Sequence, residues 1–179
     1  MLNAFITGEK IYLRPFCEDD INKWYLWFND EEVTKYSYHG VFPATYHTQK
    51  EFFCKLYSDK TNLQLAIVTK KNNILIGTVG LHQINFLHQR ADISIIIGEK
   101  NYWNKGYATD AVKILIKHGF NKMNLHRITA GVVEENIASL NLFLKLGFKK
   151  EGILREHKFA NNKFSNVIQL GLIKKEFIY

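Results

Sequence analysis

Cysteine and proline are scarce in this sequence, and it has no long apolar run. Its two cysteines among 179 residues, Cys17 and Cys54, lie far apart and lack the CxxC spacing of zinc and redox sites. They allow one disulfide at most, so we expect reduced thiols and a cytoplasmic protein. No segment approaches the roughly 18 consecutive apolar residues that span a bilayer, and the first thirty residues do not resemble a signal peptide. We therefore expect a soluble protein without a membrane partner.

Metal-binding patterns and linkers are absent as well. The seven histidines show neither HxxxH nor HxH spacing, so we expect no metal site. There is no Pro/Ser-rich linker, low-complexity tract or internal repeat, and the only prolines are Pro15 and Pro43. Because 46% of the residues are hydrophobic, the chain can bury a substantial core. We predict a single domain over residues 1–179.

The formal net charge of +7 suits a polyanionic partner: nucleic acid, a nucleotide cofactor or a nucleotide-linked substrate. The lysines occur as scattered pairs, which are usually solvated, and not along one basic helix. No helix-turn-helix, RNP or zinc-finger signature is present, so we expect no nucleic-acid partner.

Hydrophobic periodicity predicts a chain that mixes strands and helices. We expect strands over 11–16, 63–69, 74–84, 91–99, 126–133 and 167–173, and helices over 18–30, 47–59, 107–121 and 136–146. The KKNN turn joins two of these strands in a hairpin. The β-branched run 91–99 is typical of a central strand buried on both faces.

The stretch 91–116 combines a strand, a loop and the start of a helix. Gly106 and the small Ala108 would let backbone N–H groups approach a pyrophosphate, whose charge the positive end of the helix dipole favours. The same glycine also fits an ordinary left-handed turn before a helix. On the residues alone, both interpretations stay open.

The segment Trp103–Ala108 resembles the acetyl-CoA-binding motif of the GNAT superfamily of N-acetyltransferases, whose core pattern is Q/RxxGxG/A. YWNKGYATDA is similar to the subgroup of ribosomal-protein N-terminal (Ala/Ser) acetyltransferases and spermidine N-acetyltransferases, although Trp103 replaces the commoner Gln or Arg. Segments 7–20, 127–148 and 151–173 also look like this subgroup. The resemblance implies an α/β (α+β) GNAT fold, with a central mixed, mostly antiparallel sheet flanked by about four helices, and acetyl-CoA as cosubstrate.

The resemblance also implies where acetyl-CoA binds. The pantetheine would lie beside the backbone of one strand, the pyrophosphate in the glycine turn, and Asn136 would face the far end of the pantetheine, although it also fits a helix N-cap. The cofactor-binding residues implied are Ile95, Ile96, Ile97, Trp103, Asn104, Lys105, Gly106, Tyr107, Ala108, Asn136 and Phe143.

Acetyl transfer needs a neutral amine, and Asp92 is our first candidate for the catalytic base. It matches an acidic residue that often begins this strand in the subgroup, and alternation places it on one face with Ser94 and Ile96. A surface carboxylate paired with Arg90 is the alternative. His82 is a second candidate base, and Glu134 and Glu135 have a sufficient explanation as residues before a helix start.

Many GNAT enzymes carry a tyrosine at the position of Phe143, and that tyrosine is thought to protonate the departing CoA thiolate. Phenylalanine cannot donate a proton, so the catalytic acid is either Ser139 or water. Ser139 also fits an ordinary polar residue in the first turn of a helix. We still expect activity. General acid catalysis typically increases the rate by only about 10² to 10⁴, whereas proximity and orientation lower the activation barrier by about 7 to 11 kcal/mol.

The acceptor is expected to be a small-molecule amine or a protein N-terminus. We place an amino sugar and a protein N-terminus ahead of a polyamine, because a positively charged protein repels polyamines at long range. The acidic NDEE (29–32) favours a polyamine locally. Aromatic side chains on the acceptor side fit a pocket lining or ordinary core packing; they are Trp24, Trp27, Phe28, Tyr36, Tyr38, Phe42 and Tyr46.

A second class of function remains open beside the enzyme. The loss of the tyrosine at position 143 is compatible with a catalytically inactive acyl-CoA-binding sensor, which would bind CoA without turnover. The sequence does not fix the oligomeric state, and it is compatible with a homodimer.

Overall fold

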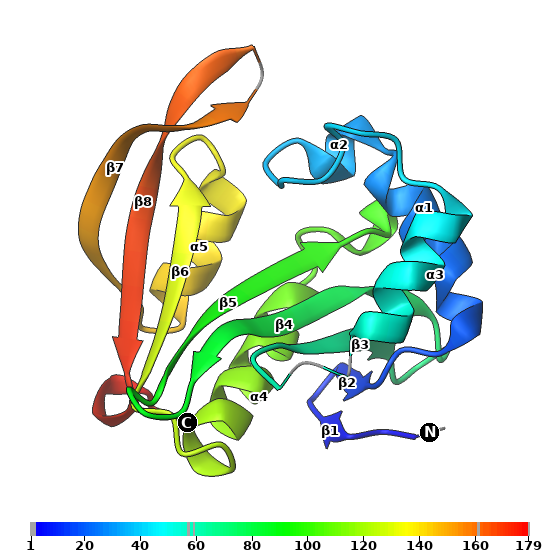
Figure 1. The fold of residues 1–179 in the computed structure, drawn as a ribbon. Helices are drawn as coiled ribbons and strands as arrows, with labels where there is room; N and C mark the ends of the chain where they lie inside the picture. Colours follow the sequence, from blue (N-terminus) through cyan, green and yellow to red (C-terminus); the bar gives the residue numbers. More distant parts are fainter. Residues whose placement is uncertain (1–2, 57, 59, 161, 179) are drawn as a thin grey trace.

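The computed structural model describes residues 3–56, 58, 60–160 and 162–178, whose strands form one eight-stranded sheet with helices on both faces (Figure 1). The strands are β1 (Ile6–Thr7), β2 (Ile11–Arg14), β3 (Leu63–Thr69), β4 (Leu75–Asn85), β5 (Arg90–Ile97), β6 (Arg127–Val133), β7 (Lys149–Ala160) and β8 (Lys163–Ile173). The α-helices are α1 (Ile21–Phe28), α2 (Glu31–Thr34), α3 (Tyr46–Lys55), α4 (Tyr107–Asn121) and α5 (Ile137–Lys145). Short 3₁₀ turns occupy Glu18–Asp20, Lys100–Tyr102 and Lys174–Glu176.

The sheet is mixed and mostly antiparallel, as the resemblance implied. The strand order is β1-β2-β3-β4-β5-β6-β8-β7, and each neighbouring pair is antiparallel except β5 and β6, which are parallel. Helix α4 connects these two parallel strands, because a crossover must return the chain to the starting edge.

Alternation along the strands divides the core between the two faces of the sheet. Leu13 packs in a cluster with Phe120 of α4, whereas the adjacent Tyr12 packs in a second cluster with Trp24 of α1. The first cluster also takes in α5, and α3 lies beside α1 over the second. The sheet is therefore covered by α4 and α5 on one face and by α1 and α3 on the other.

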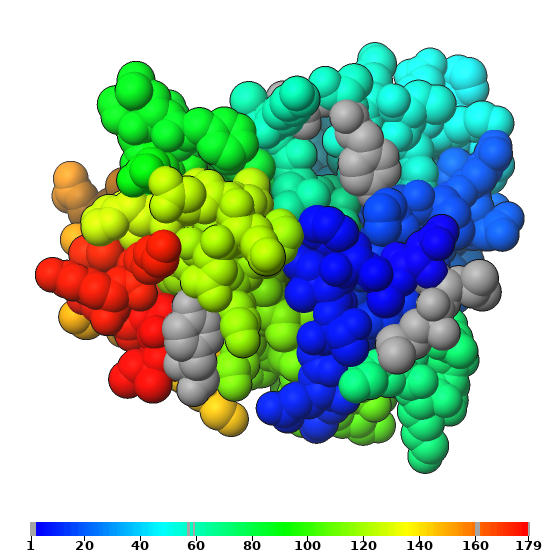
Figure 2. Space-filling model, turned by 90° about the horizontal axis from the view of Figure 1, so that it is seen from below, coloured from blue at the N-terminus to red at the C-terminus, as the bar shows by residue number. Residues whose placement is uncertain are grey.

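Helix α4 is held between the two ends of the described chain (Figure 2). The Phe5 ring meets His118 edge-on, with ring centroids 5.0 Å apart. On the other side, the Phe120 and Phe177 centroids are 5.8 Å apart. These contacts fix the helix whose first turn forms the anion end of the candidate site.

Most sequence predictions of elements are confirmed. The predicted helix 107–121 matches α4 at both ends, the hairpin is β3 and β4, and Asn136 caps α5. The predicted helix 18–30 divides into a 3₁₀ turn and α1. Of the predicted helix 47–59, α3 accounts for the part up to Lys55, and residues 57 and 59 lie outside the described residues.

Two features differ from the prediction. The central strand is not buried on both faces: Arg90 and Ser94 are exposed, and Ile95–Ile97 are half-buried because a cavity lies beside them. The elements β1 and α2 were not predicted, since two and four residues are too short to show a hydrophobic period.

Candidate functional site

Strands β5 and β6 separate soon after they begin, and this separation opens the candidate site (Figure 1). Their parallel pairing covers only Arg90–Asp92 against Arg127–Thr129. Farther along, Ile95–Ile97 pair with β4, while β6 pairs with β8. The backbone of Ile95–Ile97 therefore presents one edge to the opening, where peptide N–H and C=O groups can bind a ligand.

A cavity of about 650 Å³ occupies this opening. It is lined by α2 and the loop after it, by β5, by the first turn of α4 and by α5. The structure brings ten of the predicted site residues together here: Ile95, Ile96, Ile97, Trp103, Asn104, Gly106, Tyr107, Ala108, Asn136 and Ser139. The volume and the elongated set of lining elements suit a small organic ligand.

The turn into α4 supplies anion-binding chemistry. Gly106 is the N-cap of the helix and has a φ of +81°, a conformation that residues with a Cβ rarely adopt. Its neighbour Asn104 also has a positive φ, of 57°. In this geometry the first N–H groups of α4 lack helical partners and point toward the cavity end, where the helix dipole favours a phosphate. The residues present therefore fit the pyrophosphate of acetyl-CoA.

Trp103 connects this turn to the central strand. Its indole Nε1 donates a hydrogen bond of 2.7 Å to the carbonyl oxygen of Ile97. Gln or Arg at this place could reach a ligand, whereas the indole N–H is already used within the protein. Trp103, where the family pattern has Gln or Arg, thus stabilises the loop between β5 and α4.

Asn136 and Ser139 approach the cavity from α5. The Asn136 carboxamide oxygen accepts a hydrogen bond of 3.2 Å from the Ser139 backbone N–H, which makes Asn136 the N-cap. The Asn136 side-chain amide keeps two donors beyond this bond. The capping and ligand-binding interpretations of Asn136 are thus compatible in one conformation.

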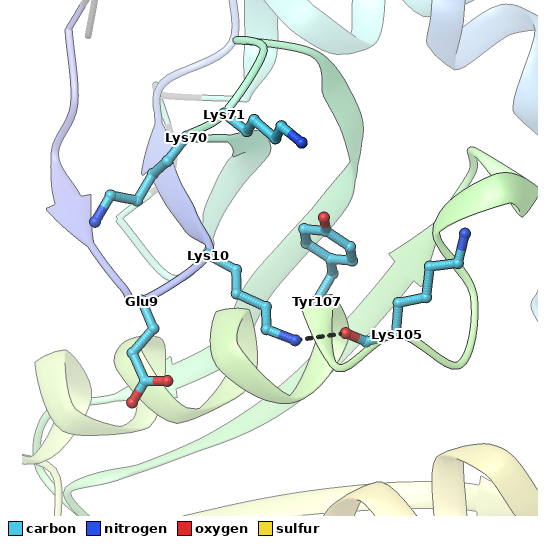
Figure 3. A pocket seen from close by; sticks show the side chains of 6 residues that line it. All are labelled: Glu9, Lys10, Lys70, Lys71, Lys105 and Tyr107. Atoms are coloured by element: carbon cyan, nitrogen blue, oxygen red, sulfur yellow. Dashed lines mark hydrogen bonds between the residues drawn. The ribbon is translucent and has the colours of Figure 1, made fainter.

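Two of the predicted cofactor-binding residues do not line this cavity with their side chains. Phe143 is 2% exposed and packs edge-on against Phe148, with ring centroids 5.0 Å apart, inside the core. The Lys105 side chain lines a separate, neighbouring cavity (Figure 3). Phe143 faces the core because α5 turns that side of the helix toward β6 and β8.

The candidate bases lie together where β5 and β6 are still paired. Asp92 accepts a hydrogen bond from the Thr129 hydroxyl and stands opposite His82 in the β4–β5 register, so Arg90 is not the partner found for it. His82 Nε2 lies 2.7 Å from the Ser94 hydroxyl. Burial lowers the pKa of His82, although Asp92 opposes this effect, so the imidazole is neutral at pH 7. None of these three polar groups belongs to the cavity lining as described.

Sequence reasoning missed most of the cavity lining that comes from α2 and the loop after it. Glu32, Val33, Lys35 and Ser37 line the cavity from α2 and the loop that follows. Asp30 caps α2 by accepting bonds from the backbone of Glu32 and Val33. The sequence pattern that could have predicted α2 is the N-cap Asp30 followed by two acidic residues. It marks a helix start, but no hydrophobic period follows it.

The aromatic side chains predicted on the acceptor side have different fates. Tyr36 lines the cavity, and its carbonyl oxygen accepts a bond of 2.5 Å from the Lys158 ammonium of β7. Burial lowers the pKa of Lys158, which also lies 4.2 Å from the centroid of the Tyr38 ring. The three residues of α1 in that set are buried in the core, and Phe42 and Tyr46 are exposed.

No group of three or more His, Cys, Asp or Glu side chains is placed to hold a metal ion within the described part of the chain. The described helices include none with the length and apolarity to cross a membrane.

Known proteins resemble this chain over nearly its whole length. The acetyltransferase (GNAT) domain family matches residues 10–149. The uncharacterized N-acetyltransferase p20 of Bacillus licheniformis is 34% identical, covering 94% of this chain and 96% of that protein. Spermidine N(1)-acetyltransferase of Escherichia coli K12 is 27% identical, covering 96% of this chain and 90% of that one.

Solved structures share the fold. Spermidine N-acetyltransferase from Vibrio cholerae, solved with CoA and spermine, has a TM-score of 0.86 at 24% identity, over 93% of this chain and 97% of that one. A GNAT-family acetyltransferase from Bacillus anthracis has a TM-score of 0.83 at 28% identity, over 96% and 99% of the two chains. The family matches most of the chain, β5 and β6 separate, and the turn at Gly106 before α4 can bind an anion. The protein therefore belongs to the GNAT family of acetyl-CoA-dependent N-acetyltransferases.

Proposed function

We propose that this enzyme transfers the acetyl group of acetyl-CoA to a primary amine of a small, cationic acceptor of the polyamine class. The observation that carries the acceptor is the similarity to spermidine N-acetyltransferases along nearly the whole chain. This reverses the order expected from net charge, in which the polyamine came after an amino sugar and a protein N-terminus.

Acidic residues that could attract a cationic acceptor gather on the α2 side of the cavity. Asp30, Glu31 and Glu32 lie at the start of α2, and Glu32 lines the cavity. The Lys100 ammonium is 2.8 Å from Asp30 and 2.9 Å from Glu32, so one cation is shared by two carboxylates. Coulomb interactions between exposed groups are screened within about 10 Å, so charges outside the cavity act weakly on the acceptor; within the lining, Glu32 is acidic and Lys35 and Lys145 are basic.

The orientation of acetyl-CoA follows from the anion-binding turn at Gly106, before α4. With its pyrophosphate at the start of α4 and its pantetheine along Ile95–Ile97, the thioester would reach toward the end of the opening where β5 and β6 pair. Asp92, Ser94 and His82 stand at that end. This orientation places the bond to be broken near the candidate bases.

The proposed reaction is direct transfer. The neutral amine nitrogen attacks the thioester carbonyl carbon, the C–S bond breaks, and CoA leaves as a thiolate that takes up a proton. The amine proton passes to Asp92 or, through the Ser94 hydroxyl, to the neutral His82. Since Phe143 has no donor group, the thiolate is protonated by Ser139 or by water; a thiol with a pKa near 8.5 is a fair leaving group in either case.

Acetylation of an acceptor panel tests this proposal. We would incubate the protein with acetyl-CoA and polyamines, nucleotide amino sugars or amino-terminal peptides, and follow thiol release and product mass. We expect acetylated polyamine. Acetylation of only peptides or only sugars would contradict the polyamine acceptor and leave the transfer reaction intact, whereas tight acetyl-CoA binding without any product would favour the inactive sensor.

Glu32→Gln sharpens the test of the acceptor. We expect this variant to raise the KM for a polyamine severalfold while leaving acetyl-CoA affinity unchanged, because the lost charge is at the mouth. Glu18→Gln is a matched control, since it removes an exposed carboxylate paired with Lys50, outside the cavity lining.

A further inference from the structure

His82 and Ser94 lie on the face of the sheet that carries α1 and α3. Leu81 and Ile93 are buried in the cluster around α4, on the other face. Alternation therefore turns the next residue of each strand, His82 and Ser94, away from α4. Ser94 pairs with Gly80 in the β4–β5 register, two residues from His82. The His82 ring and the Ser94 hydroxyl are thus diagonal neighbours across the two strands.

The glycine at position 80 leaves room for these two side chains to meet. A Cβ on Gly80 would lie 3.0 Å from His82 Nε2, and closer still to Gln64 Oε1. Without that Cβ, His82 Nε2 lies 2.7 Å from the Ser94 hydroxyl oxygen. Ser94 is exposed, so its hydroxyl is accessible to a substrate.

Asn62 contacts the other nitrogen of the His82 ring. It immediately precedes β3, and its carboxamide Oδ1 lies 3.2 Å from His82 Nδ1. The Asn62 amide nitrogen donates a bond of 3.1 Å to the Thr61 hydroxyl, so the oxygen is the end of the carboxamide that faces the ring. The Thr61 carbonyl oxygen accepts a bond of 2.8 Å from the Ile84 backbone N–H, which holds this segment beside β4.

These contacts decide which ring nitrogen carries the proton of neutral His82. A carboxamide oxygen can only accept, so the ring donates to Asn62 from Nδ1. Nε2 then has a lone pair, and the Ser94 hydroxyl donates to it. Among the neighbours of the ring, Asp92 is charged, whereas Asn62 and Gln64 are not. Because burial outweighs Asp92 and lowers the pKa of His82, the neutral ring prevails at pH 7.

We propose that Asn62 is a positioning residue for acetyl transfer, which holds the His82 proton on Nδ1 so that the amine proton can pass through Ser94 to Nε2. This inference rests on the proposed direct transfer. As the amine nitrogen bonds to the carbonyl carbon and the C–S bond breaks, the amine proton moves to the Ser94 oxygen and the Ser94 proton moves to His82 Nε2. Asn62 still accepts from Nδ1–H of the imidazolium, and Asp92 stabilises its charge until the proton passes to water.

NMR of nitrogen-15-labelled protein measures the position of the ring proton. Two-bond proton–nitrogen correlation spectra at about pH 8, above the range in which histidines titrate, show which ring nitrogen carries the proton. His82→Gln identifies the His82 signals. We expect Nδ1–H in the wild type. In Asn62→Leu, which has a similar shape but no acceptor, we expect Nε2–H, the usual form of a solvated imidazole.

Turnover connects the position of this proton to the reaction. We expect Asn62→Leu to lower kcat about tenfold. The KM for acetyl-CoA should not change, because Asn62 lies outside the cavity lining as described. Asn62→Asp keeps an acceptor oxygen and should restore kcat at about pH 8. Its carboxylate favours the imidazolium and so raises the pKa of His82, which means that kcat falls off at a higher pH than in the wild type.

Thr78→Val is the matched control for a loss of packing or stability. The Thr78 hydroxyl is buried on the same face of β4, and it bonds to the Gln64 side chain and the Leu65 carbonyl oxygen. We expect this variant to melt at a lower temperature, with the His82 proton and the pH dependence of kcat as in the wild type. Nε2–H in the wild type would overturn the proposal, as would a loss of kcat in Asn62→Leu no larger than in Thr78→Val.

The spectra need no acceptor, so this proposal and the proposed function can fail separately. Absence of turnover with every acceptor would contradict acetyl transfer, even with the His82 proton on Nδ1. Turnover by the wild type with an unchanged kcat in Asn62→Leu would leave the enzyme function intact and overturn the role of Asn62. An Asn62→Asp variant whose kcat does not fall off at a higher pH would show that His82 takes no part in proton transfer.

Discussion

At the scale of single residues, Gly106 is a position of the candidate site where the backbone conformation restricts the sequence. A non-glycine residue with its positive φ costs roughly 1–2 kcal/mol, and a Cβ would meet the Lys10 ammonium. We expect Gly106→Ala to weaken acetyl-CoA binding about tenfold, because the turn must shift away from the pyrophosphate. Titration calorimetry of the folded variant measures this change.

Gly152→Ala is the control for that prediction, since a Cβ at position 152 meets nothing within 4 Å. We expect it to bind acetyl-CoA like the wild type. Unchanged affinity in a folded Gly106→Ala variant would contradict the placement of the pyrophosphate.

Asp92 and His82 can be distinguished from simple structural residues by the pH dependence of the reaction. Because burial lowers the pKa of His82 below its usual value of about 6.5, protonation of the imidazole is expected to lower kcat/KM only at a pH below the range in which an ordinary histidine titrates. We expect Asp92→Asn to lower turnover about 10² to 10⁴-fold with little change in acetyl-CoA affinity. A turnover equal to the wild type across pH 6 to 9 would remove Asp92 as a base.

At the scale of elements, the long helices and strands could be predicted from hydrophobic periodicity, whereas the short elements depend on local geometry. Helix α4 shows four turns of apolar spacing, so its bounds could be predicted, whereas α2 depends on one N-cap, Asp30. The pairing of Asp92 with both His82 and Thr129 depends on cross-strand register, which no single strand reveals. The part of the cavity lining from β5 and α4 was therefore predictable, and the part from α2 and the loop after it was mostly not.

A buried ion pair joins β2 to the 3₁₀ turn before α1. Arg14 donates to both carboxylate oxygens of Asp20, at 2.6 and 2.8 Å, and Asp20 is only 5% exposed. We expect Arg14→Met to lower the free energy of unfolding by roughly 3 kcal/mol, because it leaves a buried carboxylate without its cation. Urea denaturation at pH 7 measures the loss. Lys50→Met removes the exposed partner of Glu18, which lies in the same 3₁₀ turn as Asp20. It should lower the free energy of unfolding by less than about 1 kcal/mol.

The pH dependence of stability follows from the same pair. Burial alone would raise the pKa of Asp20, but the bonds from Arg14 and from the Cys17 backbone lower it overall. Because the folded pKa lies below the unfolded value of about 3.9, this stabilisation is present above pH 4 and is lost as the pH falls further. In Arg14→Met the burial effect remains, so the mutational loss should be smaller at pH 3 than at pH 7. An equal loss at both pH values would show that packing, and not charge, is the cause.

At the scale of the whole molecule, the site lies between two parts of one sheet that share only a short parallel ladder. Strands β1 to β5 lie on one side of the opening and β6, β8 and β7 on the other, with three register pairs between β5 and β6. The shared core around α4 holds the two sides together. The cavity is lined by β5 and α4 and, on the other side, by α5, which packs on β6, so a cosubstrate bound there should stabilise the fold as a whole.

Acetyl-CoA is expected to raise the melting temperature in a single cooperative transition. At one hundred times its Kd, a ligand that binds only the folded state contributes about 2.7 kcal/mol. For a chain of this length, each kcal/mol shifts Tm by about 2–4 °C, so we expect an increase of roughly 5–11 °C in calorimetric scans without acceptor. Gly106→Ala at the same acetyl-CoA concentration should show a smaller increase and Gly152→Ala the full one. Two separate transitions, of which acetyl-CoA shifts only one, would mean that the two sides of the opening unfold independently and that the cosubstrate contacts only one of them.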